Sequence, residues 1–105
     1  MCIRDRIDDR LRVAGWALDG VLRAVGDDPQ PSMSLVTDVM AMKREVALAG
    51  IEVCDLAMEL AGGTAYYKGS PIERAYRDIR AAKFHPFTPE ATLVHAGRLA
   101  LGFDA

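Results

Sequence analysis

Apolar residues recur at helical spacing along most of the chain. Near the N-terminus, charged side chains fall between apolar residues three or four positions apart: Ile7, Leu11, Ala14, Leu18, Val21 and Val25. This period is that of an amphipathic helix, so we predict a helix over residues 7–25. Gly15 and Gly20 each cost about 1 kcal/mol relative to Ala inside a helix, and we expect them to mark close contact with a neighbouring helix. Gly26 can supply the C-cap, and residues 27–32, with two prolines, predict a loop.

The longest periodic segment runs from Ser34, which we expect to be its N-cap, to Leu60. Its steps of four and three are unbroken: Leu35, Val39, Met42, Val46, Ala49, Val53, Leu56 and Leu60. A second apolar stripe lies beside the first: Val36, Met40, Ala47, Ile51, Cys54 and Met58. Because more than half of the circumference is apolar, this helix must pack against at least two others. We interpret the remaining acidic residues, seven positions apart, as a solvated face: Asp38, Glu45, Glu52 and Glu59.

Two more helices are predicted after the pair Gly62–Gly63, which stops the long helix. The first begins with the capping box Ser-Pro-Ile-Glu at 70–73 and should end before Pro86. The second has Thr88 as N-cap and runs over residues 89–101, with Gly102 ending it. Its narrow apolar stripe consists of Leu93, Ala96, Ala100 and Leu101.

These elements predict an all-α fold, an antiparallel helical bundle. A bundle with one two-faced helix and so few partners leaves apolar surface uncovered. We expect the exposed patch to include Met40, Met42, Ile51 and Met58, and we expect the chain to form a homo-oligomer or to aggregate.

Composition and charge exclude several classes of protein. The chain has 105 residues, enough for one small domain, and its net charge of −2 gives no indication of nucleic-acid binding. No apolar run reaches the roughly 20 residues of a membrane span. Cys2 and Cys54 are not spaced as metal ligands, so we expect no metal site and a cytoplasmic protein with reduced thiols. We interpret residues 1–6, MCIRDR, as a non-native leader, with native sequence over 7–105.

The motifs of the second half, taken in order, resemble those of one family. Gly62–Gly63 precede a helix with Glu73–Arg74 and Arg77–Asp78, and Thr88 opens the last helix. This order is similar to that of the C-terminal helical domain of the acyl-CoA dehydrogenase family. The first half resembles that domain only by its helical pattern. The resemblance implies that residues 7–105 form an incomplete domain. By the same resemblance, we expect the family's first long helix of this domain, its preceding helical domain and its middle β-domain to lie outside residues 7–105.

The resemblance implies an FAD-dependent oxidoreductase acting on the CH–CH group of an acyl thioester such as acyl-CoA. It also implies a homo-oligomer, and an electron-transfer acceptor as a further partner. By position in the family motifs, the residues expected to contact FAD are Glu59, Ala61, Gly62, Gly63, Thr88 and Glu90. Read as residues alone, the Gly pair is a C-cap and Thr88 an N-cap with a helix dipole suited to an anion. The parent is expected to be an enzyme, and this fragment alone to be inactive.

The catalytic base stays unassigned. The family's usual glutamate, two residues before the threonine, corresponds to Pro86, which cannot act as a base, and Phe87 stands where glycine is usual. His85 is adjacent, but a lone loop histidine more often forms surface hydrogen bonds. Two alternatives remain: a piece of a flavin-dependent monooxygenase of the same superfamily, and a non-catalytic oligomerisation module. Arg77 and Asp78 are expected to tie their helix to the long helix or another domain, and one of Tyr66 and Tyr67 to line an acyl pocket or to pack at its rim.

Overall fold

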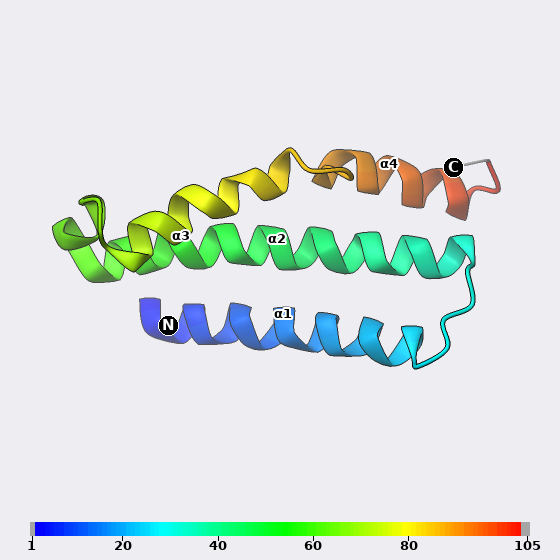
Figure 1. The fold of residues 1–105 in the computed structure, drawn as a ribbon, viewed down its shortest axis with the longest axis horizontal. Helices are drawn as coiled ribbons and strands as arrows, with labels where there is room; N and C mark the ends of the chain where they lie inside the picture. Colours follow the sequence, from blue (N-terminus) through cyan, green and yellow to red (C-terminus); the bar gives the residue numbers. More distant parts are fainter. Residues whose placement is uncertain (1, 104–105) are drawn as a thin grey trace.

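The computed structural model describes residues 2–103, and every regular element in that range is helical. Two long helices come first, α1 (Ile3–Val25) and α2 (Met33–Ala61), followed by a 3₁₀ turn, η1 (Gly62–Tyr66). The chain continues through α3 (Pro71–Ile79), a second 3₁₀ turn, η2 (Arg80–Lys83), and α4 (Pro89–Ala100). Figure 1 shows α1 running antiparallel to α2, and α3 and α4 returning along α2 in succession. The predicted all-α antiparallel arrangement is confirmed.

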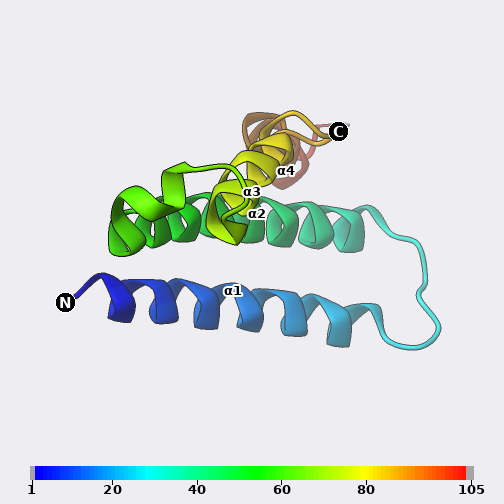
Figure 2. The same ribbon diagram turned by 60° about the vertical axis from the view of Figure 1, so that its left-hand side comes forward.

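The helices form an open layer rather than a closed bundle. Both views place α1 on one side of α2 and the α3–α4 segment on the other (Figures 1 and 2), and α1 packs on α2. The Cα radius of gyration is 16.3 Å, whereas a compact chain of this length has about 13 Å. The central helix is therefore covered along two sides, and the surfaces of α1 and α2 beside their seam remain open.

The starts of α1 and α2 differ from the predicted ones. Ser32, not Ser34, is the N-cap of α2: its backbone is extended, and its Oγ accepts a hydrogen bond from the Leu35 amide at 3.0 Å. Ser34 lies inside the first turn and is exposed. A capping side chain accepts from the third helical amide when its residue stands directly before the first helical residue. Ser32 meets this condition, because α2 starts at Met33 and the third helical amide is that of Leu35. Helix α1 begins at Ile3 instead of Ile7, with the Cys2 sulfur 3.5 Å from the Asp5 amide.

Neither reciprocal bond of the predicted capping box at α3 is formed, although Ser70 still caps the helix. Ser70 is the N-cap and Pro71 the first helical residue, but the Ser70 hydroxyl accepts from the Ile72 amide at 3.3 Å. The Glu73 carboxylate forms an ion pair with Arg77 at 3.4 Å, one turn further on. The α-helical part of this segment ends at Ile79, and η2 carries the chain on toward Pro86.

The hydrophobic core is small and lies along α2 and η1. The buried apolar residues are Ala47, Ala49, Ile51, Leu56 and Ala65. Ile51 is therefore wrongly predicted as part of an exposed patch, since α2 turns it inward, and the three methionines of that patch are half-buried. Gly15 and Gly20 do not mark close helix contacts, because nothing lies within 4 Å of a Cβ built on either. The close approach is at Gly50, where a Cβ would lie 2.9 Å from Ile79 Cδ1.

Candidate functional site

The start of α4 presents two of the predicted nucleotide-binding residues. Thr88 has extended backbone geometry, and its Oγ1 accepts from the Ala91 amide at 3.2 Å, which confirms the predicted N-cap. The Thr88 hydroxyl keeps its own proton to donate to a ligand. Pro89 is buried, whereas the Glu90 side chain is exposed in the first turn. The arrangement suits a phosphate or a hydroxyl-bearing ligand, because the first-turn amide of Glu90 has no acceptor within the helix.

The other predicted residues lie at the C-terminal end of α2. Gly62 is the C-cap, with φ +71° and its amide donating to the Met58 carbonyl. A Cβ built on Gly62 or Gly63 would meet nothing within 4 Å, so this backbone is open to solvent. Ala61 is half-buried and Glu59 is exposed. The glycine pair therefore offers accessible backbone to a ligand approaching from outside.

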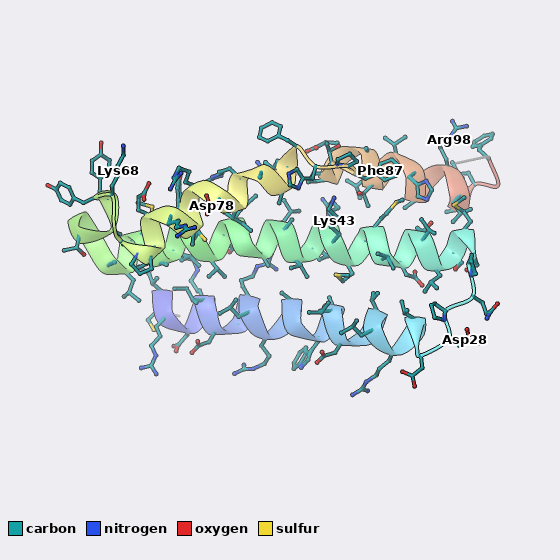
Figure 3. The ribbon with its side chains drawn as sticks, viewed as in Figure 1. Asp28, Lys43, Lys68, Asp78, Phe87 and Arg98 are labelled. Atoms are coloured by element: carbon teal, nitrogen blue, oxygen red, sulfur yellow. The ribbon has the colours of Figure 1, made fainter. Side chains whose placement is uncertain are left out.

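The two groups do not form a single site within one copy of the chain. The loop before Thr88 lies against Lys43, and the other group begins at Glu59, which is 16 residues later on α2. At 1.5 Å per helical residue these points are about 24 Å apart along the helix. Figure 3 shows Lys43 and Phe87 at a distance from Lys68, which follows the glycine pair.

Lys43 was not singled out from the sequence. Its side chain is half-buried, and its Nζ donates to the carbonyl oxygens of His85 at 3.4 Å, of Pro86, and of Phe87 at 3.5 Å. Three consecutive carbonyls of the turn before α4 therefore converge on one ammonium group of α2. No motif marks this contact, because it joins a helix residue to a loop more than 40 positions away.

His95 is the second residue that the sequence did not indicate. Only 8% of it is exposed, and its Nε2 lies 2.9 Å from Thr37 Oγ1 on α2. The Thr37 hydroxyl also donates to the Met33 carbonyl at 2.8 Å, and because it has a single proton, this pairing assigns the proton of the Thr37–His95 contact to His95 Nε2. The Phe87 ring packs with its centroid 5.8 Å from that of the imidazole.

The inward face of α4 is therefore partly polar, and the predicted apolar stripe is wrong. Thr92 and His95 are buried, whereas Leu93 and Leu101 are exposed. The helix faces α2 with Pro89, Thr92 and His95 because these residues are one turn apart, and hydrogen bonds satisfy the polar groups. Leu93 and Val94 are left on the outer surface of α4, whereas Ala96 and Leu99 are half-buried.

Residues 6–90 match the family described as "Acyl-CoA dehydrogenase, C-terminal domain". The chain belongs to this family. The match extends over the motifs that carried the resemblance, from the first helix to the start of α4. It begins at residue 6, and the interpretation of residues 1–6 as a non-native leader stays a prediction.

Two curated relatives are similar to parts of this family domain. The Bacillus subtilis (strain 168) protein named "Putative acyl-CoA dehydrogenase YdbM" is 33% identical over 67 residues, which cover 64% of this chain and 18% of that protein. The L-evernosamine nitrososynthase of Micromonospora sp. (strain ATCC 39149 / NRRL 15099 / SCC 1413) is 32% identical over 80 residues, covering 75% and 19% respectively. The chain thus spans about a fifth of the length of these relatives. No solved structure matches it significantly.

Pro86, which the motif order predicts to stand where the family usually has its catalytic carboxylate, accepts a hydrogen bond from Lys43 through its carbonyl. The predicted correspondence of Pro86 to that position stays a prediction. The exposed His85 lines a groove of about 290 Å³ with Met42, Ile79 and Ala82 among its walls. Burial, and then the neighbouring Asp55, raise the pKa of the Cys54 thiol, while Arg80 opposes them, so Cys54 is not activated as a nucleophile.

The paired charges of α3 act within their own helix. Arg77 pairs with Glu73, and Asp78 pairs with Arg74 at 3.6 Å. The expected tie from these two residues to α2 is therefore not formed, and a tie to another domain stays a prediction. A contact with α2 is made by Arg80, whose Nη2 lies 3.0 Å from Asp55 Oδ1 on α2. Tyr66 and Tyr67 form an edge-to-face pair with centroids 5.9 Å apart, and both are exposed, so neither packs in the core of the described residues. The role of one of them in an acyl pocket stays a prediction.

Within residues 2–103, no helix is long and apolar enough to cross a membrane. In the same range, no three side chains from His, Cys, Asp and Glu gather closely enough to hold a metal ion.

Proposed function

We propose that this chain is the C-terminal part of an FAD-dependent, acyl-CoA dehydrogenase-like oxidoreductase that acts on the CH–CH group of an acyl thioester. Its contribution would be contacts to the FAD nucleotide and part of the subunit interface. The observation that supports this proposal is the start of α4, where a capping threonine and an exposed acidic residue stand at the helix N-terminus, in the order of the family motif.

The residues at both ends of the proposed site suit the groups of FAD chemically. The Thr88 hydroxyl can donate to a phosphate oxygen, and the Glu90 carboxylate can accept from a ribose hydroxyl. The exposed backbone of Gly62 and Gly63, with Glu59 and Ala61 beside it, would approach the flavin of a neighbouring subunit. Two copies would thus each supply one end, which accommodates the separation of about 24 Å along α2.

When bound, FAD would supply the hydride acceptor for oxidation of the acyl chain. The base that removes the α-proton is not assigned to a residue of this chain. The exposed His85 is not favoured, because a proton-abstracting group benefits from a dry pocket that tunes its pKa. We therefore expect His85→Ala to change the rate of acyl-thioester oxidation little in the flavin-containing protein.

A subunit interface is supported by the apolar side chains left open on α1 and α4. The exposed large apolar residues of these two helices are Leu11, Val13, Trp16, Leu18, Leu22, Leu93 and Val94. Apolar surface of this extent favours association. The purified 105-residue chain should be dimeric or larger by light scattering. A monomer that binds no hydrophobic dye would contradict this part of the proposal.

A second candidate is a flavin-dependent monooxygenase of the same superfamily. Pro86 at the position of the usual base favours it, since an oxygenating enzyme does not need that carboxylate. The similarity to a nitrososynthase points the same way. Oxidation of acyl thioesters by the flavin-containing protein would support the dehydrogenase. Oxygen consumption driven by reduced flavin would support the monooxygenase.

Thr88→Val tests the FAD contact directly. The substitution removes a hydroxyl and keeps the side-chain volume, so the flavin-containing protein should lose FAD during gel filtration. The amide of Ala91 also loses its cap, and Thr88→Ser is the matched control, because it keeps both the hydroxyl and the cap. Retention of flavin by Thr88→Val equal to that of Thr88→Ser would contradict the nucleotide contact. We expect no stable flavin complex from the 105-residue chain alone.

A further inference from the structure

We propose that Lys43 is a positioning residue for the nucleotide-binding start of α4. It holds the turn formed by residues 85–87, and through that turn it sets the orientation of Thr88 and Glu90. The inference rests on the proposed function for the nucleotide contact, but the structural part of it stands on the geometry around Lys43 alone.

The ammonium group of Lys43 has as many N–H donors as this turn has carbonyl oxygens within hydrogen-bonding distance of it. It has three N–H donors, and three carbonyl oxygens from consecutive residues accept from it. Because its donors are occupied, Lys43 is not available as a direct phosphate ligand. Figure 3 shows Lys43 pointing from α2 toward the segment that precedes Phe87. Its role is therefore to organise protein backbone.

Three carbonyl dipoles directed at one point repel one another unless a cation lies there. Hydrogen bonds from a charged donor are also stronger than those between neutral groups. The conformation of the turn thus depends on the Lys43 charge. The residue next to this turn is Thr88, whose cap bond to Ala91 fixes the first turn of α4. A change in the turn moves the Thr88 hydroxyl first.

The body of α4 is held independently of Lys43. His95 Nε2 lies 2.9 Å from Thr37 Oγ1, and this hydrogen bond joins the middle of α4 to α2 seven residues beyond Thr88. Loss of Lys43 should therefore loosen the turn and the first residues of α4 without detaching the helix. In addition, a positive charge behind the helix N-terminus adds to the dipole and favours an anion there.

Hydrogen exchange in the full 105-residue chain tests the structural part. Lys43→Met keeps most of the aliphatic stem and removes the charge and donors. We expect peptides covering residues 84–92 to exchange about tenfold faster, which is the effect of losing a charged hydrogen bond at a partly exposed site. Lys43→Arg should restore most of the protection, and Lys83→Met, at an exposed lysine of η2, should change nothing in these peptides. Unchanged exchange in both Lys43→Met and Lys43→Gln would overturn the positioning role.

Flavin retention by the flavin-containing protein tests the link to function. Lys43→Met should lower the fraction of flavin retained after gel filtration, measured by visible absorbance, and Lys43→Arg should restore it. If exchange rises but flavin retention is unchanged in Lys43→Met and in Thr88→Val alike, the nucleotide assignment of Thr88 fails while Lys43 still orders the turn. If Thr88→Val loses flavin and Lys43→Met does not, the positioning proposal itself is overturned.

Discussion

Helices α1 and α4 pack on opposite sides of α2 by different means. The seam of α1 is long and apolar, yet none of the residues of Ile3–Val25 is buried. Helix α4 is half as long, with 12 residues against 23, and buries Pro89, Thr92 and His95. It is also joined to α2 by Thr37–His95 and by the Lys43 contacts to its preceding turn.

The difference shows that the apolar periodicity of a helix determines which helix it pairs with. How deeply its side chains are buried depends on whether further parts of the protein cover the flanks of that pair. Helix α1 pairs with α2 along one stripe and keeps Trp16 and Leu22 exposed on its flanks. One of its few polar contacts is Arg10 with Glu52, where Nε lies 2.6 Å from Oε2. The Arg10 N–H is not directed at that oxygen, so the contact is an ion pair rather than a hydrogen bond. The orientation of α4, by contrast, is specified by hydrogen bonds with defined partners.

The largest effect is expected at the apolar seam. Leu56 is 4% exposed and lies one turn after Glu52, on the side of α2 that faces α1. Leu56→Ala should lower the free energy of unfolding by about 2–3 kcal/mol, the lower part of the range for buried leucines, because the surroundings are open enough to relax. Urea titration at low protein concentration would measure it.

Leu18→Ala is the control for Leu56→Ala, since Leu18 is 41% exposed on the flank of α1. We expect it to cost less than about 1 kcal/mol. Equal costs for the two variants would mean that the flank is buried in the species measured. In that case the contrast between buried Leu56 and exposed Leu18 would hold for a single copy of the chain but not for the associated protein.

A smaller effect is expected at the polar seam. Thr37→Val leaves the His95 Nε2–H without its acceptor in a buried position, which should cost about 1–2 kcal/mol. The cost should largely vanish when His95→Leu is already present, giving a coupling of about 1 kcal/mol in a double-mutant cycle. Thr64→Val, at an exposed threonine of η1, should cost less than about 0.5 kcal/mol. Additive effects of Thr37→Val and His95→Leu would show that the hydrogen bond does not hold α4.

The contrast between the apolar α1–α2 contact and the polar α4–α2 contact also explains which features of the fold could be predicted from the sequence. The periodicity of residues 7–25 and 34–60 predicted both long helices, because each position repeats the same physical demand to be buried or exposed. The stop at Gly62 and the cap at Thr88 were predicted from local chemistry and are confirmed. These features involve residues that are neighbours in sequence.

The features that were missed join distant parts of the chain. His95 stands between apolar residues in the sequence and was not considered, since nothing near it indicates that Thr37 would be its partner. Lys43 likewise reads as a solvated charge on a helix, although three loop carbonyls bind it. The predicted apolar stripe through Leu93 is wrong because that prediction required an apolar surface on α2. At this position α2 instead presents the Thr37 hydroxyl, which pairs with His95. The FAD contacts of Glu59, Ala61, Gly62, Gly63, Thr88 and Glu90 stay predictions.

The smallest effect concerns the cap of α2, and it can show whether the polar seam depends on helix order. Ser32 caps the turn that contains Met33, whose carbonyl accepts from Thr37, the partner of His95. Ser32→Ala should lower stability by about 1 kcal/mol, and Ser34→Ala, inside the same turn, should have almost no effect. Because fraying begins at Met33, amide exchange should rise at the start of α2 and in α4 but not in the middle of α1. Ser70→Ala, at the longer 3.3 Å cap of α3, should leave exchange in α4 unchanged. An equal rise along α1 in the Ser32 variant would mean that both seams rest on the same first turn, and the two sides of α2 would then not be independent.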